Sequence, residues 1–317
     1  MMIRQRLVVA VAFLVCLGVV PMAAHAYPPA AMDHGWQSVG EQGATHGISG
    51  VAVVGRDGEA TEALVVRDNS QPGEGRVATV RLRPGADPEV RELHWKGTPP
   101  GDLEALDAVP GRPHHYIALA GGGTGYHLRV VRDTLTVLGS FTVPGAERGD
   151  DDYQGFALFP HGERLVAVWA DRGDDTRPAT VRAATFDPGR LALGTPTAVA
   201  WRVPRPGADV RHVSDLKVSP SGALMVVSTS GVGEEGPFDS VVYDAGRLSV
   251  DGAGTVSLTM RTAPVELGGF PGHKVEALGC LPRTGESSQA GQLGQALLGA
   301  DDERAGGALR FAGVCLQ

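Results

Sequence analysis

The sequence has few aromatic residues, and no stretch of it shows a sustained helical period. Phe, Trp and Tyr make up 5% of the 317 residues, whereas glycine occurs 45 times and proline 22 times. Frequent glycine and proline are typical of short strands joined by tight turns. Without a helical period, this composition argues against a helical bundle and predicts an all-β protein.

Several motifs of well-known chemistry are also missing. The chain has no Gly-x-Ser-x-Gly elbow, no P-loop and no dinucleotide-binding fingerprint. Its three cysteines lack the spacing of a zinc site. The glycines at 121–123 precede no predicted helix, so we expect a turn there and not a phosphate-binding loop. These absences argue against the common nucleotide-binding and serine-hydrolase classes, and they leave the activity open.

Positive charge is scarce, since no run of Lys or Arg occurs and the net charge is −8 at pH 7. An acidic surface repels phosphate, so we expect no nucleic acid partner. Beyond the first 26 residues no stretch is long and apolar enough to cross a bilayer, so we expect no membrane association of the mature chain. We also expect a monomer.

The first 26 residues have the pattern of a secretory signal. Arg4 and Arg6 precede an apolar segment at 7–20, and small residues at 24–26 suit cleavage. Loss of the two arginines takes the net charge from −8 to −10. We therefore predict a signal peptide over 1–26 and a periplasmic or secreted protein; an uncleaved anchor is the alternative.

Two cysteines, Cys280 and Cys315, remain after cleavage at that position. An oxidising compartment favours a disulfide between them. Two buried free thiols are the alternative, because the sequence does not give the distance between their Cα atoms.

One strand-like segment recurs along the chain. Residues 102–110 read Asp-Leu-Glu-Ala-Leu-Asp-Ala-Val-Pro, and 275–282 is nearly a copy. Segments 153–160 and 213–220 keep the same frame, and 48–54 is the weakest member. A turn and further apolar strand-like segments follow each copy. A repeat of this kind is typical of a propeller or a solenoid.

The spacing of the repeats predicts their number of strands. Their corresponding positions, separated by 55, 50, 60 and 62 residues, are Ser49, Glu104, Gln154, Ser214 and Glu276. Such spacing fits a four-stranded blade with its loops, whereas a β-sandwich gives no reason for the repeat. The last repeat lacks a fourth strand, and 35–39 forms a strand without a neighbouring partner. We predict one domain over 27–317, a five-bladed β-propeller of four-stranded antiparallel blades in which this N-terminal strand completes the last blade.

Polar residues are expected to meet at one end of the central channel. In a propeller the starts of the inner strands and the loops between second and third strands open on the same face. The residues that we predict to bind a ligand there are Ser49, Glu104, Gln154, Asp171, His212, Ser214, His273, Glu276 and Asp301. The same two regions also contain Asp68, Asp102, Asp152 and Arg172.

These side chains allow three interpretations. Oxygen atoms of Glu104, Gln154 and Glu276 could coordinate a hard cation such as Ca²⁺, the one cofactor that we consider. Glu104 and Glu276, together with Asp301 and Glu303, are also candidates for a catalytic acid and base. In the third interpretation these groups only satisfy backbone N–H groups where each blade begins.

Short motifs in the repeats resemble the secreted propellers grouped as esterase-like phytases. The motifs are Glu-Ala-Leu at 104–106, a Pro-x-Gly turn at 160–162, and 297–303 followed by two glycines. Three of the five corresponding positions carry Ser or Gln where that group has Glu. The resemblance implies a propeller, a bound metal and phosphoester hydrolysis, with Glu104, Glu276, Asp301 and Glu303 as candidate functional residues.

We therefore predict an exported propeller that binds a small ligand or a protein partner at the mouth of its channel. The alternative is a metal-assisted hydrolase of phosphoesters, esters or lactones that uses the same face.

Overall fold

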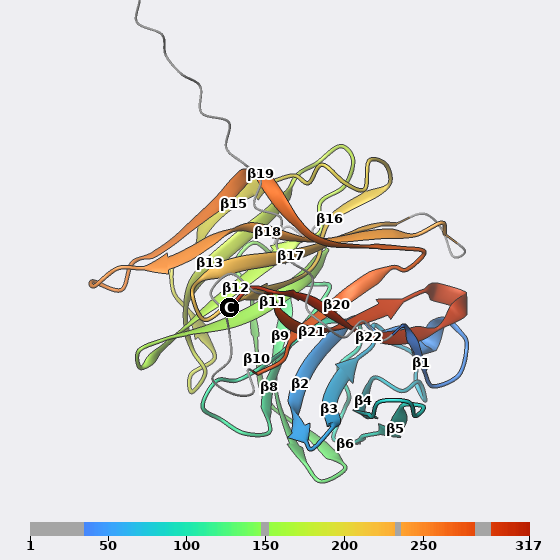
Figure 1. The fold of residues 1–317 in the computed structure, drawn as a ribbon. Coiled ribbons are helices and arrows are strands. Elements are labelled where there is room, and N and C mark those ends of the chain that lie inside the picture. The colour runs from blue at the N-terminus through green and yellow to red at the C-terminus, as the bar shows by residue number, and fades with distance from the viewer. Residues whose placement is uncertain (1–34, 147–151, 232–235, 283–292) are drawn as a thin grey trace, which may run out of the picture.

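The computed structural model describes residues 35–146, 152–231, 236–282 and 293–317, and these form a five-bladed β-propeller (Figure 1). The predicted signal peptide at 1–26 lies outside the described residues. Within the described ranges, no helix is long and apolar enough to span a membrane. The architecture agrees with the sequence prediction.

Each blade is a mainly antiparallel sheet whose strands follow one another from the axis outward. Blade I consists of β2 (Gly50–Asp57), β3 (Ala60–Val66), β4 (Val77–Leu82) and β5 (Glu89–Glu92). Blade II consists of β7 (Leu103–Ala108), β8 (His115–Ala120), β9 (Thr124–Val131) and β10 (Thr134–Thr142), with β6 (His94–Lys96) parallel to β10. Blade III consists of β11 (Tyr153–His161), β12 (Arg164–Asp171) and β13 (Ala179–Asp187), with β14 (Ala192–Leu193) and β15 (Thr197–Trp201) both paired to β13. Blade IV consists of β16 (Val210–Val218), β17 (Ala223–Ser230), β18 (Asp239–Val250) and β19 (Val256–Pro271).

Blade V joins the two ends of the chain. It contains β20 (Val275–Cys280), β21 (Gly294–Asp301) and β22 (Gly307–Cys315), and its outer strand is β1 (Gln37–Val39). The β1 strand pairs antiparallel with β22, Ser38 opposite Ala308, which confirms the predicted closure. A disulfide between Cys280 and Cys315, with Cα atoms 5.8 Å apart, links β20 to β22 and confirms the predicted pair.

The hydrophobic core lies between the blades. Its five clusters each combine residues of two neighbouring blades, so that every blade is held by both neighbours. Small residues let the inner strands approach closely. A Cβ atom on Gly50 would lie 2.9 Å from the Leu106 backbone nitrogen in blade II, and one on Gly155 would lie 2.9 Å from Cγ of Leu216 in blade IV.

Buried charged groups join the inner strands across the axis. Lys217 of blade IV, 6% exposed, donates to the backbone oxygens of Leu106 and Phe156 at 3.1 and 3.0 Å. Asp107 accepts from the Leu158 N–H at 2.7 Å, and Asp215 accepts from the Leu278 N–H at 2.7 Å. We call these three residues the axial plug. Through it, blade IV is bonded to blades II, III and V, and blade II to blade III.

Candidate functional site

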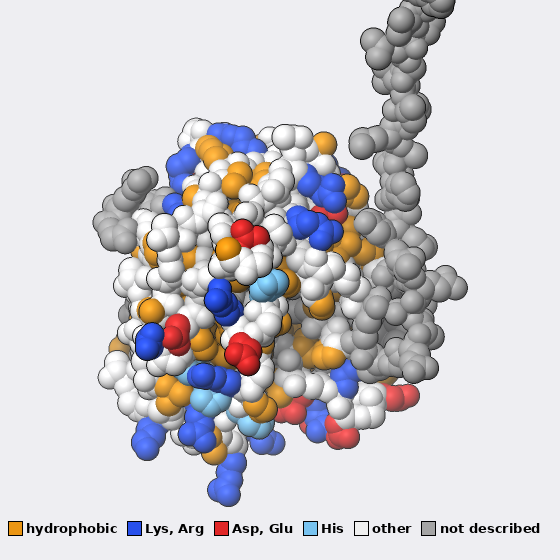
Figure 2. Space-filling view, turned by 90° about the vertical axis from the view of Figure 1, so that its left-hand side faces the viewer, with side chains coloured by type: hydrophobic (Ala, Val, Ile, Leu, Met, Phe, Trp, Pro, Cys, Tyr) orange, Lys and Arg blue, Asp and Glu red, His pale blue; other side chains and the backbone are white. Residues whose placement is uncertain are grey.

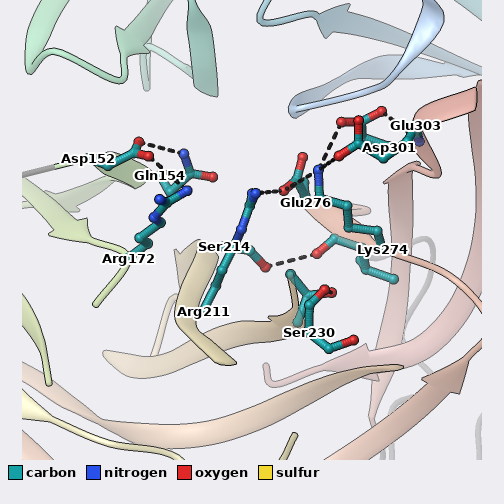
Figure 3. A network of polar contacts seen from close by, with 12 residues as sticks. Asp152, Gln154, Arg172, Arg211, Ser214, Ser230, Lys274, Glu276, Asp301 and Glu303 are labelled. Atoms are coloured by element: carbon teal, nitrogen blue, oxygen red, sulfur yellow. Dashed lines mark hydrogen bonds and ion pairs between the residues drawn. The ribbon is translucent and has the colours of Figure 1, made fainter. Parts of the chain in front are cut away.

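The starts of the inner strands and the loops between second and third strands form one face of the propeller, which we call the mouth. Figure 3 shows two groups of polar contacts there. In the first group, all from blade III, Gln154 Nε2 donates to Asp152 Oδ1 at 2.8 Å, and Arg172 Nη1 lies 2.9 Å from Asp152 Oδ2. An acidic, an amide and a basic side chain are thereby held together at the start of β11.

The second group is centred on Lys274, which is 3% exposed (Figure 3). Its Nζ lies 3.3 Å from Glu276, 3.1 Å from Asp301 and 2.5 Å from Glu303. Arg211 of blade IV reaches the same Glu276 carboxylate at 2.5 Å. Burial alone would lower the Lys274 pKa, but Glu276 and Asp301 raise it, so Lys274 is a cation within an acidic cluster.

Glu104, at the start of blade II, lies close to four other carboxyl groups. Burial raises its pKa well above the usual range, and Glu276, Asp68, Asp102 and Asp152 raise it further. It shares a side-chain hydrogen bond with Asp102, which requires a proton between the two carboxyls. Burial and neighbouring carboxyls therefore oppose ionisation of Glu104 more strongly than that of the exposed Asp102.

Two further features of the mouth are unusual backbone conformations and unpaired buried polar atoms. Asp102 and Glu303 have φ values of 59° and 52°, a left-handed conformation that costs on the order of 1 kcal/mol for such residues. Among the described residues, the buried Ser49 Oγ and Gln154 Oε1 atoms have no hydrogen-bond partner. Buried polar atoms are normally paired, so these two are exceptions to the usual pattern.

A cavity of about 380 Å³ opens beside these groups, between blades III and IV. Arg172 and Arg211 are both in its lining, and each is also paired with a carboxylate of the mouth, Asp152 and Glu276 respectively. The cavity therefore connects the two groups of Figure 3 to solvent.

The structure brings together five of the nine residues predicted to bind a ligand. Ser49, Glu104, Gln154, Glu276 and Asp301 lie in or beside the groups just described, as does Glu303 of the catalytic candidates.

The other four have structural contacts. Asp171 is fully buried between Arg177 at 2.6 Å and Arg182 at 3.1 Å. His212 Nδ1, on β16, accepts from the N–H of Val203, which follows β15, at 3.4 Å. Ser214 donates to the Val275 oxygen at 2.8 Å. His273 pairs with Asp302 at 2.6 Å and stacks on Trp36 with ring centroids 4.3 Å apart.

Sequence reasoning did not identify Lys274 and Arg211. Each is next to a histidine at the start of an inner strand, Lys274 after His273 and Arg211 before His212. Neighbouring residues of a strand point to opposite faces. The basic residues, and not the histidines next to them, therefore reach Glu276 at the mouth. A basic residue beside each histidine was the available signal.

The contacts of the predicted calcium ligands do not favour a shared ion. Among the described residues, no group of three or more His, Cys, Asp or Glu side chains is arranged to hold a metal. The Glu276 carboxylate already faces Arg211 and Lys274, and the Gln154 amide donates to Asp152. Calcium binding stays a prediction.

No family model matches the sequence, and no curated protein matches it. Several solved structures resemble the fold. The α-L-arabinofuranosidase of Podospora anserina is 11% identical with a TM-score of 0.48 and covers 87% of this chain and 95% of its own. The Penicillium chrysogenum α-L-arabinanase is 12% identical with a TM-score of 0.46 and covers 89% and 99%. The β-1,2-mannobiose phosphorylase of Listeria innocua is 10% identical with a TM-score of 0.46 and covers 88% and 91%.

At these identities and TM-scores the likeness carries no argument about activity. None of the three structures is a phytase, and the resemblance to esterase-like phytases stays a prediction from the sequence.

Proposed function

We propose that the mouth binds a small ligand through a positively charged, donor-rich group such as an amine or a guanidinium. The observation that carries this proposal is the buried Glu104 carboxyl, whose pKa is raised by burial and by four neighbouring carboxyls. A bound cation would relieve their mutual repulsion. Asp68 and Asp102 are exposed and so can reach a ligand directly.

The unpaired acceptors support the same chemistry. Gln154 Oε1 and Ser49 Oγ are buried acceptors without a partner among the described residues, and an ammonium group has three N–H bonds to donate. Lys274 and Arg211 neutralise Glu276 on the other side of the mouth, which leaves the side of blades I and II as the acidic one.

Isothermal titration calorimetry with matched probes tests the proposal. We expect 1,4-diaminobutane to bind at low ionic strength and the isosteric neutral 1,4-butanediol not to bind. Glu104→Gln should weaken diamine binding by about tenfold, because the amide cannot ionise to pair with the bound cation as the carboxyl can. Glu59→Gln, which removes an exposed carboxylate on the opposite face, is the matched control and should leave binding unchanged. Equal effects of the two substitutions would overturn the proposal.

A second candidate function is acid–base hydrolysis at the same face. Glu104 lies among carboxyls that raise its pKa, whereas Glu276 is ion-paired with Arg211, and such different environments suit the separate roles of a catalytic acid and base. Hydrolysis of p-nitrophenyl acetate, p-nitrophenyl phosphate or a γ-lactone, with and without Ca²⁺, is the test. Turnover that falls by about 10² or more in Glu104→Gln would support this function; no turnover of any probe by the unmodified protein would remove it.

A further inference from the structure

The face opposite the mouth carries the turns that join inner and second strands, and we call it the turn face. Two cavities, of about 770 and 450 Å³, adjoin on it. The larger lies between the turns of blades II and III, and the smaller between blades I and II. Both share the wall formed by residues 110–112, so Arg112 stands at their junction. Together they form one groove that crosses the turn of blade II.

Basic side chains dominate this groove. Arg112, Arg164 and Arg190 line the larger cavity, and Arg112, His114 and His115 line the smaller one. All three arginines are exposed. Figure 2 shows Lys, Arg and His side chains gathered at the lower end of the molecule, where Figure 1 places β8 to β10. An acidic protein therefore has a locally basic surface here.

The two acidic residues in the lining compensate this charge only in part. Asp187 accepts from the N–H groups of Gly189 and Arg190 at 2.8 and 3.1 Å, and its other oxygen lies 3.8 Å from the Arg190 guanidinium. Glu163, next to Arg164 in the sequence, is the remaining carboxylate of the lining. The groove therefore keeps an excess of positive charge.

A pair of histidines extends the basic surface inward. His115 Nδ1 and His127 Nε2 are 2.9 Å apart and share one proton, and His127 is 5% exposed. Burial lowers the pKa of His115, and Arg129 and Arg112 lower it further. Burial also lowers the pKa of His127, as do His115 and Arg112. Burial and the nearby cations thus both oppose protonation of the pair, and a bound anion would offset the repulsion from the cations.

We propose that this groove binds an anionic chain whose oxyanion groups, carboxylate, sulfate or phosphate, contact Arg112, Arg164 and His115. Arginine forms bidentate hydrogen bonds with such groups. An elongated ligand is favoured over a single ion because the cations are distributed along two adjoining cavities. The apolar parts of the lining, among them Val54, Pro113, Pro188 and Leu193, give the uncharged parts of such a chain a surface to pack on. The groove lies on the face opposite the mouth. This proposal is therefore independent of the function proposed for the mouth.

Binding of three oligomeric probes tests this proposal: a heparin oligosaccharide, an oligogalacturonate and polyphosphate, with neutral dextran as the control. We expect at least one polyanion to bind at low ionic strength and to weaken as salt screens the arginines. Arg112→Gln should weaken it by about tenfold, since one charge-assisted bidentate contact is lost. The probe that binds most tightly identifies the type of oxyanion.

Two matched variants make the result decisive. Arg247→Gln removes an exposed arginine of blade IV outside both cavities and should change the affinity less than twofold, a difference of about 0.4 kcal/mol. Glu104→Gln, in the mouth, should also have no effect. Failure of all three polyanions to bind, or equal losses in Arg112→Gln and Arg247→Gln, would overturn the proposal.

Discussion

Two carboxyl groups of one strand, Glu104 and Asp107 in β7, are three residues apart and lie in opposite environments. Asp107, in the axial plug, accepts from the Leu158 and Ala108 N–H groups at 2.7 and 3.0 Å, and Lys217 lowers its pKa against the effect of burial. Glu104, at the mouth, has four carboxyls as charged neighbours. Burial raises the pKa of both carboxyls, but in the plug Lys217 and two N–H groups oppose the rise, whereas at the mouth the neighbouring carboxyls add to it. Such an imbalance is typical of a functional site.

Both ends of the axis depend on the closed ring, so opening the ring should have the largest effect. Deletion of residues 35–40 removes β1 and exposes the edge of β22. We expect a loss of several kcal/mol in the free energy of unfolding, on the order of 3–5. Urea denaturation measures it. A deletion variant as stable as the full chain would show that β1 is not needed for closure.

In the plug, Lys217→Met should lower the free energy of unfolding by about 3 kcal/mol. The substitution keeps the apolar volume but removes the Lys217 Nζ donor from two buried carbonyl oxygens and the neighbouring cation from the buried Asp215 carboxyl. Lys96→Met, at an exposed position of β6, is the control and should be nearly neutral. Equal stability of the two variants in urea would mean that the plug does not stabilise the ring.

The pair in β7 gives the sharpest contrast. Asp107→Asn should cost about 1–2 kcal/mol, because an amide accepts with one oxygen only and leaves one backbone N–H unpaired. Glu104→Gln should cost less than about 1 kcal/mol, because the amide keeps the shape and an acceptor and removes the repulsion from four neighbouring carboxyls. Denaturation of both variants at neutral pH measures the difference. A larger loss for Glu104→Gln would mean that the mouth is structural.

The smallest effect concerns pH. Burial and then Glu276 raise the pKa of Asp301 to about 7, above its value in the unfolded chain. The native state therefore binds a proton more tightly, and its contribution to stability is lost as pH rises from about 4 through about 7. Asp301→Asn should flatten the fall of the free energy of unfolding over this range by up to about 1 kcal/mol per pH unit, which Tm measurements along the pH range follow. Identical Tm profiles for Asp301→Asn and the unmodified protein would contradict the assignment.

The sequence predicted the fold well because repeated strands and turns are local patterns. The recurring segment, the glycine turns and the unpaired strand at 35–39 together predicted five blades and their closure. Gly111 and Gly222, with φ values of 74° and 82°, lie in the turns where positive φ was expected.

The site was predicted only in part, because ion pairs between blades are not local. Spacing predicted that Glu104, Gln154 and Glu276 would share one face, but not that Arg211 of blade IV would neutralise Glu276 of blade V. The charge balance between Glu104 and Asp107 likewise depends on residues from other blades. The residue types along β7 therefore do not reveal by themselves that Asp107 belongs to the axial plug and Glu104 to the mouth.

The central claim, that the unbalanced carboxyls of the mouth bind a cationic ligand, is tested most directly by the pH dependence of diamine binding. Calorimetric titration of 1,4-diaminobutane at about pH 5 and about pH 8 should show tighter binding at the higher pH, because the cation binds the ionised carboxyls. Comparison of the binding enthalpies in two buffers of different ionisation enthalpy measures the protons released on binding. We expect the protein to release protons when the diamine binds. Equal affinity at both pH values, or no proton release, would contradict the account.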